Sequence, residues 1–279
     1  MPVGSNNIVT NGGSAIGEAI GSHMEIAVQK AISEFIRDYD CFFITDYGIN
    51  PRTGRKKQLK LSDQFDNEYS IDGLIINDKG HPLALLESKY IRYKKHNRDK
   101  GSWICNTHSA IRKKYKSIRS SIAVLAGNWS RPSLEMLLSY NVQVFLIPFD
   151  SICNLLDNYG IDFRWEENDD EKAQIAWETY NALSDAQKES IGEQMVSQIK
   201  ESLFEYLRGI LDDTIIRKIV RVLVEFETNK GERAVYSFAN IEDALEYIRS
   251  FNMDKAFDSS SFVSIYESVS EDNLFNDRS

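Results

Sequence analysis

Three ionisable side chains in one short stretch of the chain are of the types that hold a divalent cation and activate water. Asp72 lies inside an apolar run at residues 69–76, and Glu87 and Lys89 end a second apolar run at residues 82–90. Because side chains alternate across a strand, Glu87 and Lys89 are expected on the same face. Charges rarely end a core strand unless they are paired or bind a metal. Asp72 and Glu87 are hard oxygen ligands suited to Mg²⁺, for which Mn²⁺ can substitute, and the Lys89 ammonium can orient water and stabilise negative charge. These three residues are therefore predicted to be catalytic, with the two carboxylates as metal ligands.

The acidic-x-Lys pattern at residues 87–89 is weak by itself. The pattern occurs again at residues 170–172, and one this short recurs by chance. The second copy lies in a polar helical run without a preceding hairpin, whereas the first ends an apolar strand that follows Asp72 across a turn. This context favours the first copy. The alternative is a solvated ion pair between Glu87 and Lys89 on an edge strand.

The segments around these residues alternate between helical and strand patterns. Apolar residues recur at three- and four-residue intervals in residues 16–36, which is the spacing of an amphipathic helix. Asn-Asp-Lys-Gly at residues 77–80 is typical of a hairpin turn, so the apolar runs on either side are predicted to pair as antiparallel strands. Further strands are predicted at residues 41–47, 122–126 and 142–147, and further helices from Thr107 to about residue 120 and at residues 134–140. Such alternation predicts an α/β fold.

Ile71-Asp72 and Glu87-x-Lys89, with a helix before them and a helix and strand after them, resemble the PD-(D/E)xK nuclease superfamily. Ile71 replaces the proline that is usual before the aspartate. The resemblance covers residues 16–150. It implies a restriction-endonuclease-like mixed β-sheet core flanked by helices, and Mg²⁺-dependent cleavage of DNA that leaves 5′-phosphate and 3′-hydroxyl ends.

The same resemblance suggests a fourth catalytic residue, because members often add a glutamate from the first helix. Glu18 and Glu25 both qualify, and Glu25 is preferred because it lies beside the apolar face of the predicted helix. The alternative is that Glu25 is a solvated helix residue.

Several functions fit this core. The preferred one is a type II restriction endonuclease or another defence endonuclease acting on DNA. The alternatives are a repair, recombination or RNA-directed nuclease, and a nucleic-acid-binding module without activity. The presence of Asp72, Glu87 and Lys89 argues against the last of these.

Charge is distributed unevenly along the chain. The net charge is −9, yet residues 50–120 hold 17 Lys and Arg against 7 Asp and Glu. This segment is predicted to be a local polyanion-binding surface on an otherwise acidic protein. In the helix expected from Thr107, Arg112, Lys116 and Arg119 would form one outward stripe. A solvated face is the alternative to phosphate contact. The predicted nucleic-acid-binding residues are Lys94, Lys95, Arg98, Arg112, Lys113 and Lys116.

The domain organisation is predicted from shifts in composition. Residues 1–15 are expected to be a flexible leader, 16–163 the nuclease domain, 164–257 a mainly helical C-terminal region with a β-hairpin, and 258–279 an acidic serine-rich tail. The chain is expected to act as a homodimer, because a cut through both strands of a duplex needs two active centres. An apolar run from Ile210 to Leu223 is the predicted interface, with an intramolecular core as the alternative.

The location and the cysteines are also predicted from the sequence. No apolar run approaches the length of a membrane span, and the N-terminus lacks the pattern of a secretory signal, so no membrane partner and a cytoplasmic location are expected. Three widely spaced cysteines are expected to be buried small side chains.

Overall fold

The computed structural model describes residues 11–49, 56–94 and 97–258. The chain forms two compact units, residues 1–212 and residues 213–279, which are described separately.

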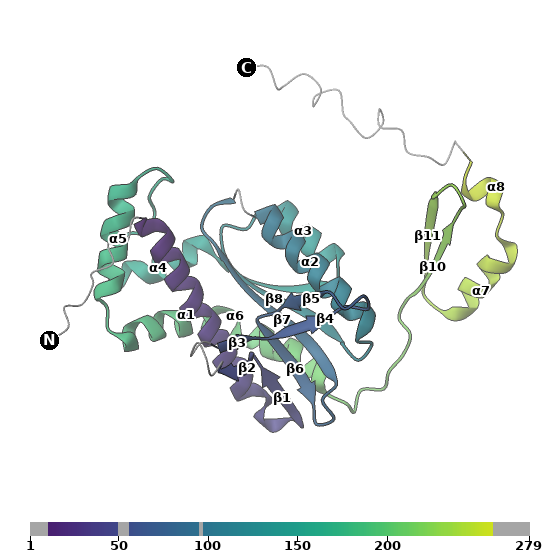
Figure 1. Cartoon of the computed structure of the whole chain (residues 1–279), viewed down its shortest axis with the longest axis horizontal. Helices are drawn as coiled ribbons and strands as arrows, with labels where there is room; N and C mark the ends of the chain where they lie inside the picture. Colours follow the sequence, from purple (N-terminus) through teal and green to yellow (C-terminus); the bar gives the residue numbers. More distant parts are fainter. Residues whose placement is uncertain (1–10, 50–55, 95–96, 259–279) are drawn as a thin grey trace, which may run out of the picture. The chain divides into compact units, whose positions relative to one another are not determined.

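A five-stranded mixed sheet forms the centre of the first unit (Figure 1). Its strands are β1 (Cys41–Ile44), β6 (Gly73–Asn77), β7 (Pro82–Ile91), β8 (Ser120–Gly127) and β9 (Val142–Pro148), in the order β1-β6-β7-β8-β9. The first three are antiparallel neighbours, whereas β7, β8 and β9 are parallel. The predicted hairpin at residues 77–80 is confirmed: the Asn77 side chain accepts the N–H groups of Lys79 and His81, and Gly80 has a positive φ of 77°. The predicted α/β class is confirmed at the level of a mixed sheet flanked by helices.

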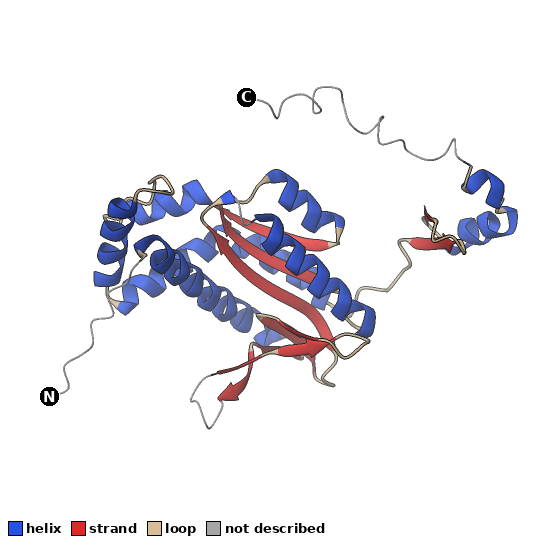
Figure 2. Ribbon diagram, turned by 45° about the horizontal axis from the view of Figure 1, so that its top comes forward, coloured by secondary structure: helices blue, strands red, loops and turns tan. Residues whose placement is uncertain are grey.

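Helices cover both faces of this sheet (Figure 2). The first face packs against α1 (Gly12–Phe35), followed by the short 3-10 helix η1 (Ile36–Asp38), and against α4 (Phe149–Asp157). The second face packs against α2 (Asn97–Lys114) and α3 (Arg131–Ser139), which contact each other. Alternation along β7 explains the two layers, because Leu86 belongs to the core on the α1 side and Leu85 to the core beside α2.

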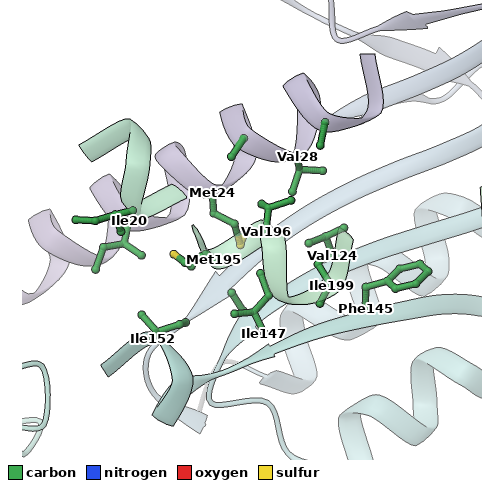
Figure 3. Close-up of a cluster of buried hydrophobic side chains, with 14 of the residues drawn as sticks. Ile20, Met24, Val28, Val124, Phe145, Ile147, Ile152, Met195, Val196 and Ile199 are labelled. Atoms are coloured by element: carbon green, nitrogen blue, oxygen red, sulfur yellow. The ribbon is translucent and has the colours of Figure 1, made fainter. Parts of the chain in front are cut away.

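Two helices beyond the predicted domain boundary complete the core on the α1 side. They are α5 (Asp170–Ala182) and α6 (Asp185–Leu211), and a capping box of Ser184 with Gln187 begins α6. Met195, Val196 and Ile199 of α6 lie against Met24 of α1 and the strand residues of the same cluster (Figure 3). At Gly192 an added Cβ would lie 2.4 Å from the His23 carbonyl oxygen, so only glycine permits this approach of α6 to α1. The boundary predicted at residue 163 is therefore wrong, and the division falls at residues 212/213.

The N-terminal helix also begins earlier than predicted. Asn11 caps α1 by accepting the Ser14 N–H, so residues 12–15 are helical and are not a flexible leader. Residues 1–10 of that predicted leader lie outside the described residues.

The connection between β1 and β6 contains two small strand pairs. One is β2 (Asp46–Ile49) with β3 (Lys56–Gln58), and the other is β4 (Lys60–Ser62) with β5 (Glu68–Ser70). The predicted single strand at residues 69–76 is thus divided between β5, which pairs with β4, and β6, which pairs with β1 and β7. Residues 71 and 72 form the bend between them.

The second unit contains β10 (Val222–Glu227), β11 (Arg233–Phe238), α7 (Ile241–Ser250) and α8 (Met253–Ala256). The predicted hairpin is confirmed, and α7 follows it. One face of the hairpin packs on α7 through rings that include Phe226, Tyr236, Tyr247 and Phe251. Of the predicted tail, residues 259–279 lie outside the described residues. No helix within the described ranges has both the length and the apolar composition of a membrane span.

Candidate active site

The bend before β6 places Asp72 next to Glu87. Gly73 pairs with Leu86, so the two carboxylate residues are adjacent across the strand pair although the chain between them turns through a hairpin. An added Cβ at Gly73 would lie 2.5 Å from Cζ of Phe43, which means that the Phe43 ring of β1 packs directly on this glycine. A side chain at this position would therefore displace the Phe43 ring at the start of β6, next to Asp72.

Asp72, Glu87 and Lys89 form one hydrogen-bonded group. Lys89 Nζ lies 2.7 Å from Glu87 Oε1 and 3.0 Å from Asp72 Oδ2. The backbone N–H of Ser88 donates to the same Asp72 oxygen at 2.9 Å. The structure thus brings together the three side chains that the sequence predicted, and it adds a backbone donor that no side-chain pattern could have indicated.

Burial sets the electrostatics of this group. The Glu87 side chain is 3% exposed, compared with 22% for Asp72 and 26% for Lys89. Burial, together with the neighbouring Asp72 carboxylate, raises the pKa of Glu87 to about 7 against the opposing effect of Lys89. Burial disfavours the charged Lys89 ammonium, but Glu87 and Asp72 outweigh it and raise the pKa of Lys89. The alternative of a solvated surface ion pair does not fit a glutamate that is this deeply buried.

One oxygen of the buried glutamate has no partner. Glu87 Oε2 is fully buried and accepts no hydrogen bond from any group in the described part of the chain. A buried carboxylate oxygen without a donor is costly unless a cation or water satisfies it. Mg²⁺ is commonly held by one or two carboxylates, with water and substrate oxygens as its other ligands. Asp72 and Glu87 fit this minimal set, although no group of three or more His, Cys, Asp or Glu side chains among the described residues could hold a metal.

Helix α2 covers the face of β7 to which Glu87 and Lys89 point. It begins at Asn97, ten residues before the predicted N-cap Thr107, whose side chain is buried in mid-helix. His108 is 1% exposed, and neither ring nitrogen has a hydrogen-bond partner among the described residues. Burial, with the charges of Arg112 and Lys89, lowers the pKa of His108 to about 3, so this ring is neutral.

His108 is not among the site residues predicted from the sequence. Its spacing from Ile104 and Ile111 places it on the buried face of an α-helix and is the signal that could have located it.

The glutamates of α1 lie on the other side of β7. Tyr90 packs against Gly17 and Gly21 of α1, so Ser88 and Tyr90 face α1 while Glu87 and Lys89 face away from it. Glu18 and Glu25 both line a cleft of about 630 Å³ that Ser88 also lines. Glu25 accepts a hydrogen bond from Gln29 at 3.0 Å. A catalytic role for Glu25 stays a prediction, and shared lining of the cleft does not separate it from Glu18.

The predicted nucleic-acid-binding residues occupy different positions. Lys94 and Arg98 are exposed near the start of α2, and Arg112 and Lys113 lie in its last turn. The helix ends at Lys114, so Lys116 is not part of it and the predicted stripe of Arg112, Lys116 and Arg119 does not form. Instead, the Arg119 guanidinium donates to the Ile210 carbonyl oxygen at 2.7 Å. Lys95 lies outside the described residues.

The second acidic-x-Lys copy differs in structure from the first. Lys172 lies in the first turn of α5 and forms an exposed ion pair with Asp169 at 3.1 Å. It is therefore a suitable control for Lys89.

Comparisons with known proteins identify no family. No family model matches the sequence, and no curated protein matches it. One solved structure that aligns with the chain is described as "Protein of Unknown Function AF1548". The alignment has a TM-score of 0.30 and 8% identity and covers 67% of this chain and 99% of that chain. A similarity this low carries no argument about fold or function.

Proposed function

We propose that the chain is a Mg²⁺-dependent endonuclease that hydrolyses DNA phosphodiester bonds at Asp72, Glu87 and Lys89. The observation that carries the proposal is the convergence of two carboxylates and an ammonium at the junction of β5, β6 and β7, with one carboxylate oxygen buried and without a donor. Side chains of these types in contact are suited to phosphodiester hydrolysis, in which negative charge develops on the attacking and leaving oxygens. The same residues carry the proposed relationship to the PD-(D/E)xK superfamily.

The order of the elements supports the proposed relationship. Helix α1 precedes the antiparallel strands β1, β6 and β7, and α2 and the parallel strand β8 follow. This agrees with the helix, strands, helix and strand that the resemblance implies. A restriction or other defence role, with 5′-phosphate products, belongs to the same proposal.

Each residue of the group has a separate part in the proposed reaction. A Mg²⁺ ion held by Asp72 and Glu87 would supply Lewis-acid stabilisation of the charge on phosphate oxygens. The Ser88 N–H holds the Asp72 carboxylate in one orientation. Lys89 donates to both carboxylates, and its ammonium can donate to the attacking water or to a phosphate oxygen as negative charge develops.

The proposal is tested with purified full-length protein. Plasmid, single-stranded DNA and RNA are incubated in Mg²⁺ and separately in EDTA, and the ends of any products are mapped. Cleavage of DNA that requires Mg²⁺ and leaves 5′-phosphates is expected. If DNA stays intact in Mg²⁺ and in Mn²⁺ over a range of protein concentrations, the proposed activity is wrong.

Neutralising the basic residues around α2 is expected to weaken DNA binding without regard to sequence. Each of Lys94→Gln, Arg98→Gln and Lys113→Gln should reduce the slope of log K against log salt by about one unit, because each lost phosphate contact removes one released counterion. Fluorescence anisotropy with a labelled duplex in EDTA at several salt concentrations measures the slope. Lys200→Gln, on α6, is the matched control and should not change it. If the slope is unaltered in the first three variants, Lys94, Arg98 and Lys113 belong to a solvated face and do not contact phosphates.

The interface of the proposed homodimer can be assigned to a shorter apolar segment than the sequence indicates. Leu211 is buried in the core of the first unit, so this part of the predicted interface is intramolecular. The apolar residues after it are more than half exposed, namely Ile215, Ile216, Ile219, Val220 and Leu223. The double variant Ile216→Asp, Val220→Asp is therefore expected to convert a dimer into a monomer, because a buried charge without a partner opposes association. Light scattering measures the change. A wild-type monomer that makes double-strand breaks with first-order dependence on protein would exclude the dimer.

A further inference from the structure

An exposed aromatic pair lies beside the proposed active site. Trp103 of α2 is 48% exposed, and its ring centroid lies 6.4 Å from that of Tyr69 on β5, with the two planes inclined at 55°. The other tryptophans differ, because Trp129 and Trp165 are buried and Trp177 packs against the core. A large aromatic side chain that is half exposed next to a second ring is a surface able to stack on a flat ligand.

The structure holds Tyr69 in place. Its hydroxyl donates to Asp63 Oδ2 at 3.1 Å, and Asp63 also accepts the N–H groups of Phe65 and Asn67. The turn between β4 and β5 is fixed to α2 as well, since Lys114 Nζ donates to Ser62 and Asp66. Tyr69 is therefore held in position before any ligand binds, which lowers the entropy cost of stacking.

The pair lies next to Asp72 by the geometry of the hairpin and the helix. Asp66 contacts Lys114 at the end of α2, and Tyr69 contacts Trp103 further toward its start. Asp72 is three residues beyond Tyr69, at the bend between β5 and β6, so the chain between them spans at most about 11 Å. A strand with a phosphate at Asp72 and Lys89 would thus have a neighbouring nucleotide within reach of Trp103.

Charge indicates what kind of flat ligand this surface takes. Helix α2 carries Arg98, Lys100, Arg112, Lys113 and Lys114 against a single acidic residue, Asp99. An aromatic pair on a mainly basic helix fits a polyanion with planar groups, which describes a nucleic-acid strand whose bases are unpaired. In an intact duplex the base faces are already stacked on each other, so this pair would have no face to contact.

We infer that Trp103 and Tyr69 form a stacking site for an unpaired nucleobase of the strand that the proposed nuclease cuts. The inference rests on the proposed function and narrows its substrate to a strand that is unpaired next to the cut, in a single strand or in a base turned out of a duplex. Stacking on aromatic side chains tolerates different bases, so the site would add affinity without reading sequence.

The test measures binding separately from cleavage. A labelled single-stranded DNA 12-mer and the fully paired duplex of the same sequence are titrated with full-length protein in EDTA. Trp103→Ala should weaken single-strand binding by about tenfold or more, the range found when one stacked base loses its aromatic partner. Trp103→Phe should retain most of the affinity, and the salt slope should not change because no charge is lost. The matched control is Tyr140→Ala, since Tyr140 at the end of α3 is also 48% exposed.

The duplex arm distinguishes the two sources of an unpaired base. If Trp103→Ala leaves duplex affinity unchanged, the site binds single strands. If Trp103→Ala weakens duplex binding as much as single-strand binding, and Trp103→Phe restores both, the site binds a base turned out of the duplex. Unchanged single-strand affinity in Trp103→Ala overturns the inference, and so does a loss that Phe does not restore.

Cleavage assays separate failure of this inference from failure of the proposed function. Binding that depends on Trp103 in a protein that never cleaves DNA leaves the stacking site in place and overturns the nuclease proposal. Cleavage by a protein whose single-strand affinity does not depend on Trp103 supports the nuclease proposal and overturns the stacking site.

Discussion

Asp72→Asn, Glu87→Gln and Lys89→Ala are each expected to lower DNA cleavage at least 100-fold, on the order of the effect of removing one group that stabilises transition-state charge. The carboxamides keep the size of the carboxylates and remove the negative charge that a cation requires. Lys89→Ala removes the ammonium that lies 3.0 Å or less from an oxygen of each carboxylate. Initial rates on plasmid DNA at saturating Mg²⁺ measure the effect, and far-UV circular dichroism verifies that each variant is folded.

The metal dependence of the variants should divide them into two groups. Asp72→Asn and Glu87→Gln are expected to need more Mg²⁺ for half-maximal residual cleavage, because each loses a proposed ligand. Lys89→Ala should lower the rate with little change in that concentration. Lys172→Ala serves as the control, since this residue has the same acidic-x-Lys spacing but pairs with Asp169 on the surface, and wild-type activity is expected. If any variant of the three retains near-wild-type cleavage, that residue is not part of the active site.

The candidate site could be predicted from the sequence because its signals are local. Glu87 and Lys89 are two residues apart in an apolar run, and strand alternation places them on one face. The turn at residues 77–80 brings Asp72 opposite Glu87. What the sequence did not show is the bend at Asp72. An apolar run is continuous across residues 69–76, and only the pairing of Tyr69 with Leu61, in place of a strand of the main sheet, separates the two halves.

The helix after the site illustrates a different limit. Residues 97–103 contain charges and Gly101, which are typical of a loop, and Thr107 was a reasonable N-cap. In the structure an added Cβ at Gly101 would lie 2.7 Å from Met136 Cε. Gly101 is therefore where α3 packs closely on α2, and this tertiary contact outweighs a low helix propensity. Propensity alone could not have placed the start of α2 at Asn97.

The domain boundary failed for a similar reason. The acidic stretch after residue 163 looked like a change of domain, but solvent-facing charge does not exclude a buried opposite face. Ala173, Ala176 and Tyr180 of α5 and Ile191 and Met195 of α6 are buried in the core that includes α1. Which partner an amphipathic helix packs against depends on contacts far apart in sequence, and composition does not report them.

Arg92 lies in the basic segment at residues 50–120, which is predicted to bind a polyanion, but its contacts in the structure give it another role. It is 7% exposed, and its guanidinium donates to the carbonyl oxygens of Phe163 and Trp165 at 2.8 and 2.9 Å. The same group lies 3.7 Å from the centre of the Trp165 ring and 4.3 Å from that of Phe163. Arg92 thus joins the end of β7 to the segment before α5, and it is not available to a phosphate.

Arg92→Met is therefore expected to lower the free energy of unfolding of the first unit by about 3 kcal/mol or more, because two buried carbonyls lose charged donors and a cation loses its place between aromatic rings. Urea denaturation followed by tryptophan fluorescence reports on this unit alone, since Trp103, Trp129, Trp165 and Trp177 all lie within residues 1–212. Arg98→Met, at an exposed position on α2, is the control and should change stability by about 0.5 kcal/mol or less. Arg92→Lys should recover little, because a single ammonium does not reproduce the planar fork that reaches two carbonyls. Equal stability of Arg92→Met and Arg98→Met would show that these contacts do not stabilise the fold, and loss of DNA affinity in a fully stable Arg92→Met would return this residue to the phosphate-binding surface.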